Sequence, residues 1–276
     1  MLGILVALAQ RKPLFVRYCG IWGHPSRFSH RLAFQLLERI AGGRNVVLAT
    51  GGGPTEPSAR NREIRWIFAT SLTESEMGHL PQAPLWRPGQ TLRVVTVARQ
   101  EPGKNTDRLI QAVSAVRGRL PVELDVVGDG SQLTALRGLA DRLGIADHVR
   151  FHGRLDHASV LRVLTDGHLF CLPSESEGFP KAVHEAMACG LPVVVTGVSV
   201  LSSLMGQVNG VILQDSEPET IATTLLDLAR DHERMARLGA SAREGARHYS
   251  LERWREEIRS HLRVGWPGFA HDASVL

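Results

Sequence analysis

The sequence has few of the residues and motifs that mark several common protein classes. Only three of its 276 residues are cysteine, and Cys19, Cys171 and Cys189 are too few and too scattered for a disulfide framework. It contains neither a CxxC pair nor an HExxH motif, so no zinc site is predicted. Aromatic residues make up 5% of the chain and do not interleave with a basic stripe, so nucleic-acid binding is disfavoured.

Long hydrophobic runs are also missing. The apolar run near the start, residues 2–9, is far shorter than the ~20 residues that span a membrane as a helix. Arg11 and Lys12 follow this run, whereas the basic residues of a signal peptide precede its apolar region. The sequence therefore predicts a cytoplasmic protein and leaves open a peripheral contact with a membrane.

What remains is the composition of an ordinary globular protein, with an uneven distribution of charge. The chain is 43% hydrophobic and 22% charged, and its length suits one large domain or two small ones. Residues 1–88 carry a formal charge of +6, and residues 89–276 carry −2. The basic segment is either an ordinary solvated surface or a region that meets an anionic partner.

Short apolar runs alternate with stretches of helical spacing after residue 90. The predicted strands are 92–98, 122–127, 149–151, 168–172, 192–196 and 210–213, and the predicted helices are 104–116, 133–143, 160–164, 181–189, 217–228, 233–246 and 251–262. Such alternation predicts an α/β fold with a parallel, Rossmann-like sheet. Ligands of these sheets bind outside the carboxyl ends of the strands, so functional residues are sought just after each strand.

Residues 1–88 are less regular. They contain candidate strands at 13–19, 45–49 and 66–70, a helix at 28–40, and an apolar start at 2–9 that suits a second helix. A Pro- and Gly-rich segment at 80–89 follows and resembles a linker. Three strands offer little apolar area for an independent domain. We therefore expect a thin α/β sheet that forms part of a larger unit.

The strongest local motif runs from Pro173 to Pro192. A strand ends there, a loop containing Glu177 and Gly178 follows, and a helix begins with Pro180 at its first position. The free N–H groups of a helix N-terminus suit an anion, and Gly178 lets backbone approach a ligand closely. Glu185 lies in a largely apolar helix; it is either a surface carboxylate or a buried one that grips sugar hydroxyls.

A second motif places two cations on one loop. Arg99 and Lys104 follow the first strand of this region and flank a Pro-Gly turn, which lets both reach one anion. A diphosphate suits them, because Arg binds it in forked fashion and Lys as a point charge. The alternative is that both are solvated surface residues.

These motifs resemble the nucleotide-sugar-binding domain of the family-four glycosyltransferases, which have the two-domain GT-B fold. The matching segments are 97–99, 104–110, 126–130, 149–153, 172–174, 177–180, 185–188 and 190–194, in the family's order and with its E-x7-E spacing at Glu177 and Glu185. The resemblance divides the chain into a partial acceptor-side domain at 1–88, a donor domain at 89–248, and a crossover helix and tail at 249–276.

The resemblance implies a hexosyltransferase-type enzyme that transfers a sugar from a nucleotide-diphosphate sugar to a glycan or lipid acceptor, with retention. Arg99 and Lys104 would hold the donor diphosphate, and Glu177 would contact the donor sugar. The remaining implied ligands are Gly153 and Arg154 near the base, Gly178, Phe179 and Pro180 at the phosphates or sugar, and Glu185 at the ribose. No metal is expected, because cationic side chains and a helix dipole can stabilise the leaving group.

The chain departs from the family in its first half. The opening strand and Gly-rich loop of the family are absent before Leu14, and Cys19 stands where many members have a His. We therefore expect an N-terminally truncated acceptor domain with an exposed sheet edge. Such a protein forms a homo-oligomer or binds a partner chain through residues 1–88. The alternative function is a nucleotide-sugar-binding remnant without catalysis of its own.

Overall fold

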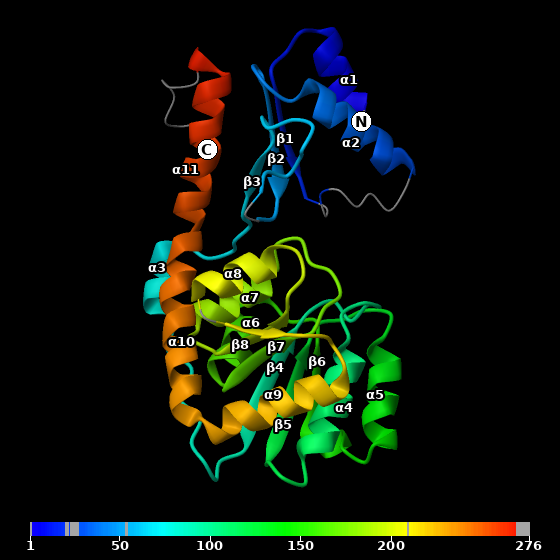
Figure 1. The fold of residues 1–276 in the computed structure, drawn as a ribbon, viewed down its shortest axis with the longest axis vertical. Coiled ribbons are helices and arrows are strands. Elements are labelled where there is room, and N and C mark those ends of the chain that lie inside the picture. The colour runs from blue at the N-terminus through cyan, green and yellow to red at the C-terminus, as the bar shows by residue number, and fades with distance from the viewer. Residues whose placement is uncertain (1, 20–21, 23–27, 53–54, 209, 269–276) are drawn as a thin grey trace. The chain divides into compact units, whose positions relative to one another are not determined.

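A computed structural model describes residues 2–19, 22, 28–52, 55–208 and 210–268. The chain divides into two compact units (Figure 1). Unit 1 comprises Met1–Thr70 and Tyr249–Leu276, and unit 2 comprises Ser71–His248. Of the helices in the described ranges, none is both long enough and apolar enough to cross a membrane.

Unit 2 contains a six-stranded parallel sheet with the order β6-β5-β4-β7-β8-β9. Its strands are β4 (Leu92–Val97), β5 (Val122–Val127), β6 (Val149–Gly153), β7 (Leu169–Leu172), β8 (Val193–Thr196) and β9 (Val211–Leu213). The strand order reverses between β4 and β7, which lie side by side at the centre. In an open α/β sheet, this reversal is where ligands bind. The predicted α/β class with a Rossmann-like sheet is confirmed.

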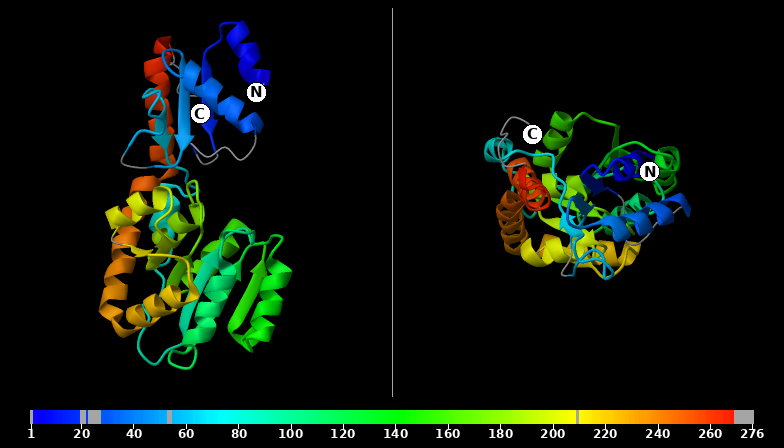
Figure 2. Two further views of the ribbon diagram at one scale, coloured as in Figure 1. Left: turned by 45° about the vertical axis from the view of Figure 1, so that its right-hand side comes forward. Right: turned by 90° about the horizontal axis from the view of Figure 1, so that it is seen from above.

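Helices pack along this sheet, and Figure 2 gives two further views of them. They are α3 (Glu74–His79), α4 (Thr106–Val116), α5 (Leu133–Arg142), η1 (Ala146–His148), α6 (His157–Thr165), α7 (Lys181–Ala188), α8 (Val200–Val208), α9 (Pro218–Arg230) and α10 (His232–Ala246). Helix α4 packs against α5 and α9, and α7 packs against α6 and α10. The apolar sides of α4, α5, α9 and α10 join the sheet in a buried core that includes Leu109, Leu124 and Leu169.

Unit 1 contains a three-stranded parallel sheet with the order β1-β2-β3. Its elements are α1 (Leu2–Ala9), β1 (Leu14–Tyr18), α2 (Phe28–Ile40), β2 (Asn45–Thr50), β3 (Arg65–Ile67) and α11 (Leu251–Gly265), which follows η2 (Arg247–Tyr249). Successive β2 side chains point to opposite faces: Val47 packs in a cluster with Leu37 of α2, and Leu48 packs with Ile258 of α11. The C-terminal helix therefore covers one face of the N-terminal sheet.

The structure places the division between Thr70 and Ser71 rather than at residue 88. The segment expected to be a linker packs within unit 2, where the Ala83 N–H donates to the Cys189 carbonyl at 2.8 Å and Trp86 is buried in the core. Two helices, α3 and α8, were not expected from the sequence. A capping box between Thr73 and Glu76 starts α3, and the T-x-x-E spacing is its sequence signal.

Candidate functional site

The loops that follow β4 and β7 meet at the reversal of strand order. The Glu175 N–H donates to the Gly103 carbonyl at 2.8 Å, and the Asn105 side chain donates to the Pro173 carbonyl at 3.0 Å. Asn105 is buried and adopts the left-handed conformation with φ 54°, a region that Asn tolerates better than most residues. These bonds join the two loops on which Arg99, Lys104 and Glu177 were predicted.

A pocket of about 940 Å³ lies over the carboxyl ends of β4, β5 and β6, next to the start of α7. Its lining consists of Val97, Ala98, Arg99, Val127, Gly128, Asp129, Gly130, Arg154, Leu155, Val160, Lys181 and Ala182. Arg99, from the two-cation loop, and Arg154, which the resemblance implies, thus line one cavity. Lys181 joins them; it lies in the motif from Pro173 to Pro192, and the sequence alone indicates no role for it.

The three cations of this pocket are not neutralised by ion pairs. Among the described residues, no carboxylate oxygen lies within 4.0 Å of a charged nitrogen of Arg99, Arg154 or Lys181. Asp129 also lines the pocket, and its carboxylate accepts a hydrogen bond from the Gly130 N–H at 2.8 Å. The cavity therefore presents a net positive lining that suits an anionic ligand.

Two glycines shape the wall of the pocket. A Cβ at Gly128, where φ is 120°, would overlap the Ala98 carbonyl oxygen, and a Cβ at Gly130 would overlap the backbone of Gln100. The buried Gln100 amide ties the same loops together, donating to the carbonyls of Ala98 and Val127 at 2.9 and 3.2 Å. Only glycine fits where these two backbone segments pack so closely.

Lys104 and Glu177 form an ion pair with a separation of 2.7 Å. The Lys104 ammonium also lies 3.4 Å from the Ser176 carbonyl. Neither residue is part of the lining described above, so the structure brings these two predicted residues to each other. The pair places a cation and a carboxylate together at the switch point.

Glu185 is buried, so it is not a solvated surface carboxylate. Its Oε1 accepts a hydrogen bond from the Ser71 hydroxyl at 2.5 Å and lies 3.3 Å from Nε2 of His157. Lys181, one helical turn earlier on the same face of α7, lines the pocket. Nothing in the sequence near Ser71 or His157 indicates that either lies next to this carboxylate.

The other predicted residues frame these groups. Gly153 has φ 65°, and its carbonyl accepts from the Gly128 N–H at 2.8 Å. A Cβ at Gly178 would meet nothing within 4 Å, so packing does not require glycine there. Phe179 and Pro180 are buried. Pro180 is the N-cap with extended backbone rather than the first helical residue, and α7 begins at Lys181, as the predicted helix 181–189 does.

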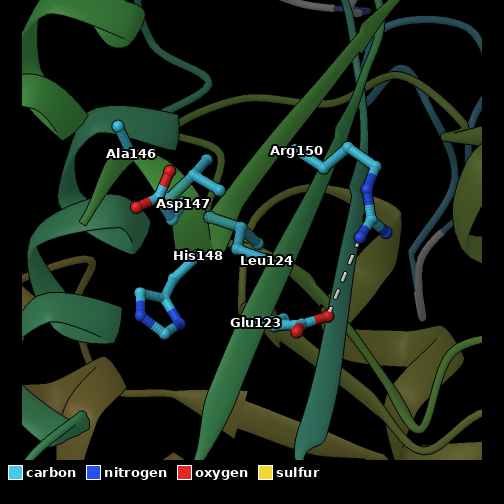
Figure 3. A pocket seen from close by; sticks show the side chains of 7 residues that line it. Glu123, Leu124, Ala146, Asp147, His148 and Arg150 are labelled. Atoms are coloured by element: carbon cyan, nitrogen blue, oxygen red, sulfur yellow. Dashed lines mark ion pairs between the residues drawn. The ribbon is translucent and has the colours of Figure 1, made fainter.

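A second pocket, of about 210 Å³, lies at the other end of the strands. Figure 3 shows its side chains, which come from the amino-terminal parts of β5 and β6 and from η1. The dashed line marks the pair of Arg150 with Glu123 at 4.0 Å. Within the described part of the chain, no group of three or more His, Cys, Asp and Glu side chains is placed to hold a metal ion.

Comparison with known proteins decides the family. A family model described as "Glycosyl transferases group 1" matches residues 83–245. The chain belongs to this family. The match covers all of the pocket and the Lys104, Glu177 and Glu185 positions, and it confirms the predicted resemblance.

Curated proteins that are similar to this chain are named as glycosyltransferases and mannosyltransferases. The D-inositol 3-phosphate glycosyltransferase of Segniliparus rotundus is 29% identical over 84% of this chain and 60% of its own length. The GDP-mannose-dependent alpha-(1-6)-phosphatidylinositol monomannoside mannosyltransferase of Mycolicibacterium smegmatis is 31% identical over 60% of this chain and 45% of its own length. The chain thus spans about half the length of these relatives.

Solved structures of similar fold support the α/β architecture described above. Anabaena Alr3699/HepE, solved in complex with UDP and glucose, has a TM-score of 0.78 and 22% identity, covering 94% of this chain and 74% of its own. WaaG, a glycosyltransferase involved in lipopolysaccharide biosynthesis, has a TM-score of 0.62 and 18% identity, covering 94% and 72%. At these identities the likeness establishes the GT-B fold.

Proposed function

We propose that unit 2 binds a nucleoside-diphosphate sugar and that the chain transfers its glycosyl group to a glycan or lipid acceptor with retention. The observation that carries this proposal is the convergence of Arg99, Arg154 and Lys181 on one pocket, where none of them has an ion-pair partner among the described residues. Two guanidinium groups and an ammonium at the start of a helix match the charge of a diphosphate. Alr3699/HepE, with the same fold, was solved with UDP, which supports a nucleotide ligand.

The proposed reaction exchanges one bond at the anomeric carbon. The bond to the diphosphate oxygen breaks, and a bond to an acceptor hydroxyl oxygen forms on the same face, while the hydroxyl proton leaves with the nucleoside diphosphate. Negative charge develops on the leaving diphosphate. Arg99 and Lys104 stabilise that charge, Glu177 contacts the donor sugar, and Glu185 holds the ribose. Arg99 and Lys104 supply this stabilisation without a metal ion, so we expect a chelator to leave the rate of the reaction unchanged.

Nucleotide binding is the direct test. Isothermal titration with UDP, GDP, UDP-glucose and GDP-mannose is expected to show binding of one base class. Arg99→Ala, Arg154→Ala and Lys181→Ala each weaken it, by about tenfold if each loses one charge-assisted contact. Arg119→Ala is the matched control, because Arg119 is exposed and lies outside the pocket. Absence of binding to any of the four ligands by the unmodified chain contradicts the proposal.

Product analysis separates the enzyme from the alternative, a binding remnant that needs a partner for catalysis. This alternative is kept because the match spans only about half the length of the curated relatives. The enzyme consumes the bound nucleotide sugar with acceptor or water and releases nucleoside diphosphate. Binding with neither transfer nor hydrolysis favours the remnant.

We propose that unit 1 provides the surface that binds a second copy of the chain or a partner chain. Helix α1 has no buried residue, and Leu2, Leu5 and Val6 are 77%, 48% and 46% exposed. β1 is an edge strand, and Phe15 on it is also exposed. Apolar surface beside a strand edge favours association with a second copy or a partner chain. Light scattering that finds a monodisperse monomer at micromolar concentration overturns self-association.

A further inference from the structure

The two neighbours of Glu185 approach the same oxygen of its carboxylate. The Ser71 hydroxyl donates to Oε1 at 2.5 Å, and His157 Nε2 lies 3.3 Å from that atom. Among the described residues, none forms a hydrogen bond or an ion pair with Oε2. The Glu185 side chain is only 9% exposed, so this one-sided arrangement exists in a mostly buried carboxylate.

Three separate elements build the arrangement. Ser71 precedes α3, Glu185 lies in α7, and His157 is the first residue of α6. The carboxylate of Asp156 caps α6 by accepting from the Ser159 N–H at 2.7 Å, which fixes the backbone that carries His157. None of these three residues lines the pocket, but Leu155, two positions before His157, and Lys181, one helical turn before Glu185, both do.

The acceptor capacity of the carboxylate matches a vicinal diol. A carboxylate offers about four lone-pair positions, two on each oxygen. Two protein groups crowd Oε1, whereas Oε2 keeps both of its positions. The two neighbouring hydroxyls of a ribose supply two donors, which is the number that Oε2 can accept.

We infer that Ser71 and His157 are positioning residues that hold Oε1 of Glu185 and thereby turn Oε2 toward the ribose of the nucleotide. This inference rests on the proposed function, in which Glu185 holds the ribose. Ser71 and His157 act through Glu185 and contribute to discrimination between ribose and deoxyribose. When either residue is removed, the Glu185 carboxylate is free to rotate and either of its oxygens can face the remaining protein group. The preference for the diol then falls.

The test compares ligands that differ only in the two hydroxyls. Dissociation constants for UDP and 2′,3′-dideoxy-UDP, and for GDP and 2′,3′-dideoxy-GDP, are measured by titration calorimetry. The unmodified chain is expected to prefer the ribonucleotide by about tenfold or more, since hydrogen bonds to a charged group are strong. Ser71→Ala and His157→Ala are each expected to reduce the ratio of the two dissociation constants, dideoxynucleotide over ribonucleotide, to about threefold or less.

Conservative variants and controls distinguish positioning from damage to the fold. Ser71→Thr keeps a hydroxyl and His157→Gln keeps an N–H donor, so both are expected to restore the preference. His148→Ala, in the pocket of Figure 3, and Ser260→Ala on α11, whose hydroxyl donates to the Glu257 carbonyl, are expected to leave it unchanged. A purely structural role weakens both ligands equally and leaves their ratio intact.

The other outcomes of these binding measurements distinguish failure of the inference from failure of the proposed function. A ratio unchanged in Ser71→Ala and His157→Ala overturns the inference, and a ratio that rises overturns it as well, because the two residues then compete with the ribose. An unmodified chain that binds UDP or GDP but ignores the hydroxyls overturns the inference while nucleotide binding stands. An unmodified chain that binds no nucleotide contradicts the proposed function itself.

Discussion

The ammonium nitrogen of Lys104 lies 2.7 Å from a carboxylate oxygen of Glu177, and the two side chains are only 18% and 11% exposed. They come from the loops after β4 and β7, the neighbouring strands at which the sheet reverses its order. Removing one member of such a mostly buried pair leaves the other uncompensated. The pair therefore joins the two loops at the switch point.

Lys104→Ala is expected to weaken binding of the nucleoside diphosphate by about tenfold or more, because a charge-assisted contact is lost. Titration calorimetry measures the effect. Arg230→Ala is the control: its pair with Asp227 on α9 is exposed, and such pairs contribute little. Affinity that stays within about threefold of the unmodified chain contradicts the assignment of Lys104.

Glu177→Gln separates the sugar from the diphosphate. The substitution removes the negative charge next to Lys104 but keeps the shape of the side chain. We expect affinity for the free nucleoside diphosphate to hold or rise, because Lys104 is then released toward it, and affinity for the nucleotide sugar to fall. The difference between the two ligands is the readout. Equal losses for both ligands would show that Glu177 does not contact the sugar.

Gly128→Ala is expected to destabilise the chain by about 2 kcal/mol or more, because the new Cβ meets the Ala98 carbonyl in a backbone conformation that side chains disfavour. Gly118→Ala is the matched control. A Cβ at Gly118 meets nothing within 4 Å, so we expect a change within about 0.5 kcal/mol. The urea midpoint of unit 2 unfolding measures both. Equal midpoints for the two variants contradict the packing argument.

The sequence predicts the sheet of unit 2 well because its strands are short, Val-rich and bounded by Gly or Pro. The predicted strand 122–127 coincides with β5, and the position of Arg99 after β4 follows from the end of the apolar run. In unit 1, helix 28–40 coincides with α2. Local patterns of burial and period are enough for these elements.

The sequence cannot predict partners that are distant along the chain. Ser71 lies 114 residues from Glu185, and nothing local to either residue indicates the other. The same holds for Lys104, which the sequence assigns to a diphosphate but which the structure pairs with Glu177. Helix α8, at Val200–Val208, follows a left-handed Ser199, but its apolar residues Val200, Leu201, Leu204 and Met205 have helical spacing, so a local signal for this helix is present in the sequence.

Thiol reactivity is expected to divide the three cysteines. Burial raises the pKa of the Cys171 and Cys189 thiols to about 12 in each case, so almost none of either is thiolate near neutral pH. Cys19 is exposed. A chromogenic disulfide reagent is therefore expected to modify one thiol in the folded chain and three in denaturant. Cys19→Ser removes the fast phase; a remaining fast phase would mean that Cys171 or Cys189 is accessible.

His184 is expected to make the stability of unit 2 depend on pH. Burial lowers the pKa of this fully buried imidazole, which lies in α7 and whose Nε2 is 3.0 Å from the Ala246 carbonyl at the end of α10. Its unfolded pKa is near the ordinary value of about 6.5, so the unfolded chain binds more protons below that pH. The stability associated with neutral His184 is therefore present above about pH 6.5 and is lost as the pH falls toward the folded pKa.

His184→Gln isolates this contribution, because glutamine keeps an N–H donor for the Ala246 carbonyl and does not titrate. Urea unfolding of both proteins is compared near neutral pH and about one to two units below the ordinary His pKa. The unmodified chain is expected to lose more stability than the variant on acidification. Burial also lowers the pKa of His168 and His261, so the variant retains part of the dependence. Parallel pH profiles for the two proteins would mean that His184 is protonated as readily in the folded chain as in the unfolded one.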